Sequence, residues 1–264
     1  MEWWLGYIAI GATVGFFAGM LGIGGGAIMV PLLVMLFEAQ GLPRTHILHL
    51  AVGTAMATIL FTSVSSVRAH AMRGAIRWDI AWRMTPGILV GGLVGSGIAA
   101  FIPTAAFAAL FTGVIYIAAT NMLLDRKPKP SRRAPGIAGT SLAGFVISAT
   151  SSFAAIGGAF LSIPFMLWCN VPLLSAIGTA AAIGFPIALS GSVGFIVTGL
   201  QQAGLPSHSL GFVFLPALGG IVVASVLMAP VGAAAAHRLP TKWLRRIFAA
   251  LFYVLATRML ISLW

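Results

Sequence analysis

The sequence predicts an all-α polytopic membrane protein built from two inverted repeats. Three observations support this class. The composition is 59% hydrophobic with only 7% charged residues, apolar runs of spanning length recur along the chain, and two glycine-rich interruptions lie about half a chain apart. A chain this apolar is not an ordinary soluble domain. We expect each repeat to consist of a broken, re-entrant helical hairpin and three transmembrane helices.

Six apolar runs have the length of a membrane crossing, which takes about 20 helical residues. They are residues 47–67, 80–101, 104–124, 174–200, 209–236 and 243–263. Two further runs, residues 5–37 and 136–168, are too long for one untilted helix and contain the glycine interruptions. Each of these is either one long broken helix or a hairpin of two shorter helices.

Basic residues in the connections favour the hairpin. They concentrate in residues 68–77, 126–133 and 237–246, and short basic loops are typical of the cytoplasmic side. All three loops fall on that side only if each broken run returns to the side from which it started. Each half then has an odd number of further crossings, so the second half is inserted upside down relative to the first.

A segment rich in proline and charge separates the two halves. We expect a first transmembrane repeat over residues 1–124, a basic cytoplasmic linker over 125–135 and a second transmembrane repeat over 136–264. The net charge of +11 is explained by basic loops that set the orientation, so nucleic acid is not an expected partner. The expected location is therefore a lipid bilayer, which the chain crosses several times.

The glycine interruptions indicate a substrate site in the middle of the membrane. Residues 19–31 read Gly-Met-Leu-Gly-Ile-Gly-Gly-Gly-Ala-Ile-Met-Val-Pro, and residues 155–164 read Ala-Ile-Gly-Gly-Ala-Phe-Leu-Ser-Ile-Pro. Unwound backbone is tolerated in a bilayer only where it is packed in protein or lines a polar cavity. The helix that restarts after each break directs free N–H groups and its positive dipole end at that place, which suits an anion. Alternatively, the glycines only allow close helix packing.

Hydroxyl groups near the breaks could donate hydrogen bonds to an anion alongside backbone N–H groups. Each hydroxyl could instead bond back onto its own helix. The residues expected to bind the substrate are Gly24, Gly25, Gly26, Thr54, Ser151, Ser152, Gly157, Gly158 and Thr179.

Titratable groups are scarce in the apolar runs. The carboxylates of Glu2, Glu38, Asp79 and Asp125 all lie at span ends or in loops. His49, just inside an apolar run, is the candidate for a proton relay, and the alternative is a histidine bonded to a backbone carbonyl. We expect no catalytic residue, no cofactor and no metal-ligand cluster, so the chain is not expected to be an enzyme.

Two pairs of motifs in this sequence resemble those of a known family. Residues 22–31 read Gly-Ile-Gly-Gly-Gly-Ala-Ile-Met-Val-Pro and are followed by Ala-Val-Gly-Thr at 51–54. The second half has a Gly-Gly pair at 157–158, one glycine fewer, followed by Ala-Ile-Gly-Thr at 176–179. Over essentially its whole length the chain resembles the TauE/SafE family of sulfite and organosulfonate exporters. The resemblance implies export of sulfite, sulfoacetate, taurine or related organosulfonates across the bacterial cytoplasmic (inner) membrane.

The expected function is therefore a secondary transporter that holds a small anion between the two breaks. Because no carboxylate is expected at mid-membrane, the membrane potential alone could drive export, at about 2.3 kcal/mol per charge per 100 mV. An anion channel of the same architecture, an intramembrane enzyme and an assembly factor are the alternatives. The expected partners are the small anion and the lipid bilayer, and faces of small residues would allow a homodimer.

Overall fold

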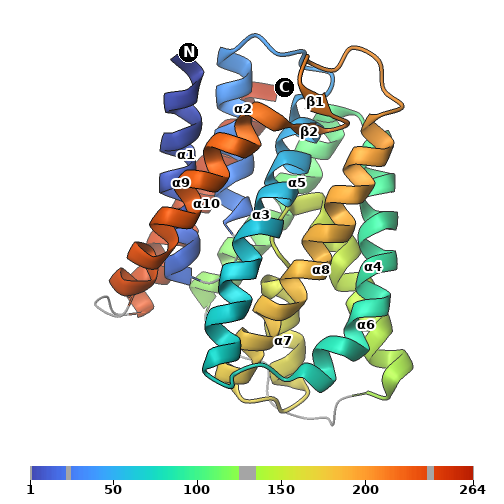
Figure 1. Cartoon of the computed structure of the whole chain (residues 1–264), viewed down its shortest axis with the longest axis vertical. Coiled ribbons are helices and arrows are strands. Elements are labelled where there is room, and N and C mark those ends of the chain that lie inside the picture. Colours follow the sequence, from blue (N-terminus) through green and yellow to red (C-terminus); the bar gives the residue numbers. More distant parts are fainter. Residues whose placement is uncertain (1, 22–24, 125–134, 237–240, 264) are drawn as a thin grey trace.

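The computed structural model describes residues 2–21, 25–124, 135–236 and 241–263 (Figure 1). Within these residues the chain is helical apart from one two-stranded hairpin. The elements are α1 (Glu2–Leu21), α2 (Gly26–Ala39), α3 (Ile47–Met72), α4 (Trp78–Phe101), α5 (Thr104–Leu124), α6 (Ile137–Ala154), α7 (Ala159–Trp168), α8 (Leu173–Gly199), β1 (Ser209–Leu210), β2 (Val213–Phe214), α9 (Leu215–Ala236) and α10 (Thr241–Leu263). In the described part, eight helices are long and apolar enough to cross a membrane, while α2 and α7 are shorter. The predicted all-helical, multi-span class is confirmed.

The six apolar runs of spanning length correspond to α3, α4, α5, α8, α9 and α10. One predicted boundary is wrong, because the run over residues 209–236 does not begin as a helix. Its first residues form β1 and β2, in which Ser209 pairs with Phe214. Positive φ angles of 68° at His208 and 56° at Gly211 turn the chain into this hairpin. The predicted linker, residues 125–135, lies outside the described residues apart from Pro135.

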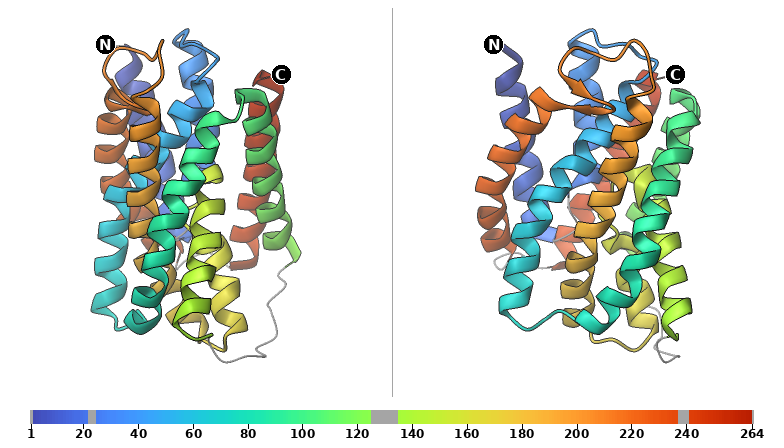
Figure 2. Two further views of the ribbon diagram at one scale, coloured as in Figure 1. Left: turned by 90° about the vertical axis from the view of Figure 1, so that its right-hand side faces the viewer. Right: turned by 45° about the vertical axis from the view of Figure 1, so that its right-hand side comes forward.

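Each glycine-broken run contains two helices that run in opposite directions. In Figures 1 and 2, α1 descends from the N-terminus and α2 returns to the upper edge, whereas α6 rises from the lower edge and α7 returns to it. Both breaks therefore lie inside the bundle. The described chain starts and ends at the upper edge.

Rows of glycines allow two pairs of helices to pack with their backbones in contact. On α1 the row is Gly11, Gly15 and Gly19, which face the backbone of Ile221, Ser225 and Ala229 on α9. On α4 the row is Gly87, Gly91 and Gly95, which face the backbone of Ser141, Phe145 and Ala149 on α6. A Cβ at any of these glycines would overlap the facing helix, so small residues are required here. As a result, α1 of the first half packs on α9 of the second, and α6 of the second packs on α4 of the first.

The two longest helices, α3 and α8, pack against each other in the interior. They are the most buried of the eight candidate spans. The two glycine breaks lie beside this pair: Gly26 would meet Ile59 of α3 if it carried a Cβ, and Gly158 would meet Ile187 of α8. The fold thus surrounds both breaks with protein.

Candidate substrate site

The two glycine breaks touch each other. Gly26, the first residue of α2, lies so close to the carbonyl oxygen of Ala155 that a Cβ on Gly26 would overlap this atom. Ala155 ends α6 in the left-handed conformation, with φ 49°, and both residues are buried. Segments that lie about half a chain apart in the sequence are therefore joined at one place inside the bundle.

The backbone has the same conformation where the short helix of each hairpin begins. Gly25 precedes α2 with φ 67° and ψ −8°, and Gly158 precedes α7 with φ 74° and ψ −19°. The carbonyl oxygen of each glycine accepts hydrogen bonds of 2.9–3.2 Å from the N–H groups three and four residues later. Positive φ strongly favours glycine. Among the described residues, neither helix start has a side-chain cap, so no described side chain occupies the first N–H groups of these helices, which could bind another acceptor.

The electrostatic potential at the two glycine breaks suits a negative charge. Both α2 and α7 begin at the breaks and run away from each other toward opposite edges (Figure 1), so the positive ends of both helix dipoles lie there. Of the carboxylates with described side chains, Glu38 lies in the last turn of α2, 3.9 Å from Arg44, and Asp79 pairs with Arg77 at 2.8 Å at the start of α4. Both are at helix ends, and neither cancels the positive potential at the breaks.

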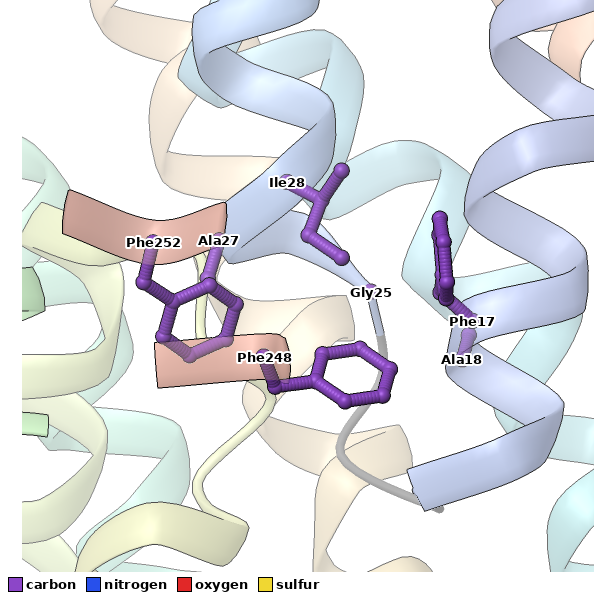
Figure 3. Close-up of a pocket in the computed structure, with 7 residues that line it drawn as sticks. All are labelled: Phe17, Ala18, Gly25, Ala27, Ile28, Phe248 and Phe252. Atoms are coloured by element: carbon purple, nitrogen blue, oxygen red, sulfur yellow. The ribbon is translucent and has the colours of Figure 1, made fainter. Parts of the chain in front are cut away.

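A cavity adjoins the first break (Figure 3). It has room for no more than about one water molecule and is lined by Phe17, Ala18, Gly25, Ala27, Ile28, Phe248 and Phe252. These residues come from α1, α2 and α10 and carry only apolar side chains, so the polar groups that they offer belong to the backbone. The sequence analysis missed the two phenylalanines of α10. Their spacing of four residues, which places both on one helix face, was the available signal.

Two adjacent serines end α6 just before the second break, and they differ in their contacts. The hydroxyl of buried Ser152 donates to the carbonyl oxygen of Ser148 at 3.0 Å and lies 3.3 Å from that of Gly92. The hydroxyl of Ser151 makes no hydrogen bond to any residue that the structure describes, although the residue is only 4% exposed. Ser162, in the first turns of α7, is fully buried and its Oγ also has no partner in the described chain. Free hydroxyls therefore flank the second break.

Thr54 and Thr179 lie against connecting loops at opposite ends of the bundle. Both are fully buried. The Oγ1 atom of Thr54 accepts a hydrogen bond of 2.9 Å from the N–H of Phe214, and that of Thr179 accepts one of 2.9 Å from the N–H of Arg77. These bonds give both threonines a structural role. Their contact with a substrate stays a prediction.

His49 is buried near the upper end of α3. Its Nε2 atom lies 3.1 Å from the carbonyl oxygen of Ala99, and the rings of Phe107 and Phe212 flank it with centroids 5.0 and 5.1 Å away. The sequence analysis gave such a bond to a backbone carbonyl as the alternative to a proton relay. A proton-relay role for His49 stays a prediction. Gly24 lies outside the described residues. Within the described chain, no three His, Cys, Asp or Glu side chains gather as metal ligands.

Comparison with known proteins places this architecture among transport proteins. A family model described as "Sulfite exporter TauE/SafE" matches residues 7–259. The chain is 33% identical over 259 residues to a "Probable membrane transporter protein" of Haemophilus influenzae, covering 97% of both chains. It is 22% identical over 262 residues to one of Methanocaldococcus jannaschii, covering 96% of this chain and 94% of the relative. No solved structure matches.

Proposed function

Because the chain belongs to the sulfite exporter TauE/SafE family and is a multi-pass membrane protein, we propose that it is a secondary transporter for small anions. The proposed substrates are sulfite and organosulfonates such as sulfoacetate and taurine, exported across the bacterial cytoplasmic membrane. The family and these relatives carry the names of transporters, so we propose transport rather than catalysis as the role of this chain.

The observation that carries this proposal is the contact between the two breaks. Gly26 touches Ala155, and the uncapped starts of α2 and α7 lie beside this contact. Free backbone N–H groups at two helix N-termini are a common way to bind a sulfonate or similar oxyanion. We propose that the anion binds between the breaks, with N–H groups after Gly25 and Gly158 and the hydroxyl of Ser151 as its donors.

The space beside the first break does not accommodate the rest of an organosulfonate. It has room for no more than about one water molecule and is lined by apolar side chains such as Phe17, Phe248 and Phe252. The carboxylate of sulfoacetate and the ammonium of taurine are charged and would be unfavourable there. We propose that the sulfonate group, like sulfite, binds at the N–H groups.

We further propose that the two halves are inverted repeats. The matching conformations of Gly25 and Gly158 support this, as do the prolines six residues after each, Pro31 and Pro164. The opposite directions of the two hairpins also agree with it (Figure 2). Two repeats of opposite orientation could alternate between states open to either side. A homodimer stays a prediction.

Export of an anion needs no coupling ion in this proposal. A potential that is negative inside drives an anion outward by about 2.3 kcal/mol per charge per 100 mV. Proton coupling usually relies on an intramembrane carboxylate or histidine. Glu38 and Asp79 lie at helix ends beside arginines, and His49 contacts a backbone carbonyl. The membrane potential is therefore the proposed driving force for sulfite and sulfoacetate. Taurine is a zwitterion without net charge at neutral pH and would move only down its own concentration gradient.

Binding to the purified protein in detergent tests the site. Sulfite, sulfoacetate, taurine and sulfate are each added, and the melting temperature is measured. At least one sulfur anion should raise it, and Gly25→Leu and Gly158→Leu should abolish the rise. Gly113→Leu is the matched control, because a Cβ at Gly113 meets nothing within 4 Å. No rise with any compound, or a rise that both break variants keep, would contradict the proposal.

A further inference from the structure

Two connecting loops are fastened to the interior helices in the same way, at opposite ends of the bundle. The loop between α8 and α9 contains the β-hairpin at the upper edge, and the loop between α3 and α4, residues 73–77, lies at the lower edge (Figure 1). The first packs on the start of α3, and the second packs on the start of α8. The loop that follows α8 thus holds α3, and the loop that follows α3 holds α8.

The atoms involved correspond one by one. In the upper contact, Gly53 faces the carbonyl oxygen of Phe212 and Thr54 Oγ1 accepts from the N–H of Phe214 at 2.9 Å. We call these four residues the upper latch. Within this latch the glycine faces one loop residue, and the threonine binds the loop residue two positions later in the sequence. The lower latch has the same spacing.

The lower latch consists of Gly178, Thr179, Ala75 and Arg77. A Cβ on Gly178 would lie 2.5 Å from the carbonyl oxygen of Ala75, and Thr179 Oγ1 accepts from the N–H of Arg77 at 2.9 Å. The hydroxyl proton of Thr179 is donated to the carbonyl oxygen of Ser175 at 2.6 Å. The threonine is therefore oriented by its own helix, and its remaining lone pair holds the loop.

The polar part of each latch is weak enough to open and close. It consists of one hydrogen bond between neutral groups and one backbone contact at a glycine, and the net contribution of one such hydrogen bond is comparable to thermal energy. The upper latch also contains the buried rings of Phe212 and Phe214, which pack on His49 and Phe37.

Thr54 lies on α3 between its upper end and Ile59, which adjoins Gly26. Thr179 lies on α8 between its lower end and Ile187, which adjoins Gly158. Release of a latch would therefore loosen the bundle on one side of the breaks.

We propose that the two latches are the gates of alternating access, and that only one of them is released at a time. This inference rests on the proposed transport function. Release of the upper latch exposes the breaks to the upper face, and release of the lower latch exposes them to the lower face. The structure, with both latches closed, corresponds to the occluded state.

Cysteine labelling in the absence of substrate tests the gates. Cys169 is the only cysteine in the sequence, so Cys169→Ser gives a background without thiols. Ala51, one turn before Thr54, and Ala176, one turn before Thr179, are both fully buried. Ala51→Cys reports on the upper latch and Ala176→Cys on the lower latch, and the rate of reaction with N-ethylmaleimide is measured in detergent.

Removal of one threonine hydroxyl should open only its own side. Thr179→Val should raise the labelling rate of Ala176→Cys about fivefold, the factor expected for one hydrogen bond, without raising that of Ala51→Cys. Thr54→Val should do the reverse. Thr179→Ser and Thr54→Ser keep the acceptor oxygen and should label like the parent. Gly178→Ala and Gly53→Ala displace the same loops by another atom and should act like the valine variants.

Equal labelling in the valine and serine variants would overturn the inference, and so would faster labelling at both reporters in every variant, which indicates general loosening. The labelling needs no substrate. If it follows the predicted pattern while no anion raises the melting temperature, the proposed substrate is wrong and the gates stand. If anions bind but the pattern fails, the gates are wrong and the anion site stands.

Discussion

Gly26 and Ala155 meet in the interior of the bundle, where the carbonyl oxygen of Ala155 occupies the place that a side chain on Gly26 would need. One residue starts α2 and the other ends α6. Because this contact joins the two glycine breaks, the first half of the chain cannot move at its break without affecting the second. The predictions below follow from this contact and from the groups around it.

Gly26→Ala should separate the two breaks. The added Cβ would overlap backbone rather than a flexible side chain, and such overpacking costs about 1–3 kcal/mol. We expect anion flux in proteoliposomes to fall by at least about tenfold while the protein still purifies as a folded species. Gly113→Ala, which meets open space, should keep its flux. Equal flux in both variants would show that the contact is not needed.

Ser151 and Ser152 should respond differently to removal of the hydroxyl. Ser151 has no hydrogen-bond partner in the described chain, whereas Ser152 binds the carbonyl oxygen of Ser148. Ser151→Ala should weaken anion binding about tenfold, since a hydrogen bond to a charged group contributes about 1.5–3 kcal/mol. Ser152→Ala should instead lower stability by about 1 kcal/mol. Both effects are obtained by measuring the melting temperature of each variant over a range of anion concentrations. Weaker anion binding in Ser152→Ala and lower stability in Ser151→Ala would contradict the prediction.

His49→Gln should retain most of the flux and leave its pH dependence unchanged. The glutamine amide can still donate to the carbonyl oxygen of Ala99, which is the contact that Nε2 makes. The measurement is flux at several external pH values in wild type and variant. If the wild type is proton-coupled and the variant loses that coupling, His49 is a relay after all.

The parts of the fold that depend on local sequence were predictable. Apolar runs of spanning length gave the long helices, since span length follows from bilayer thickness. Consecutive glycines identified the breaks at Gly25 and Gly158, because positive φ favours glycine. The β-hairpin was not predictable from hydropathy, since its residues are as apolar as a span and the turn depends on the φ angle of His208.

Contacts between distant residues were also not predictable. Thr54 and Thr179 were expected near the substrate because hydroxyl groups close to the breaks could donate hydrogen bonds to an anion. In the structure, they accept hydrogen bonds from loop residues that lie 160 and 102 positions away in the sequence. A single sequence contains no pattern that reveals such distant partners. The cavity was missed for the same reason, because Phe248 and Phe252 line it from the last helix.

Uptake of sulfoacetate by proteoliposomes under an inside-positive membrane potential, at equal pH on both sides, tests the central claim most directly. We predict saturable uptake that accumulates sulfoacetate above its external concentration under the potential, stops at equal concentrations at zero potential and is lost in Gly26→Ala, while Gly113→Ala behaves like the wild type. Uptake that fails to saturate would indicate a channel. Uphill uptake driven by a pH gradient at zero potential, or undiminished uptake in Gly26→Ala, would contradict a potential-driven carrier whose anion site lies between the two glycine breaks.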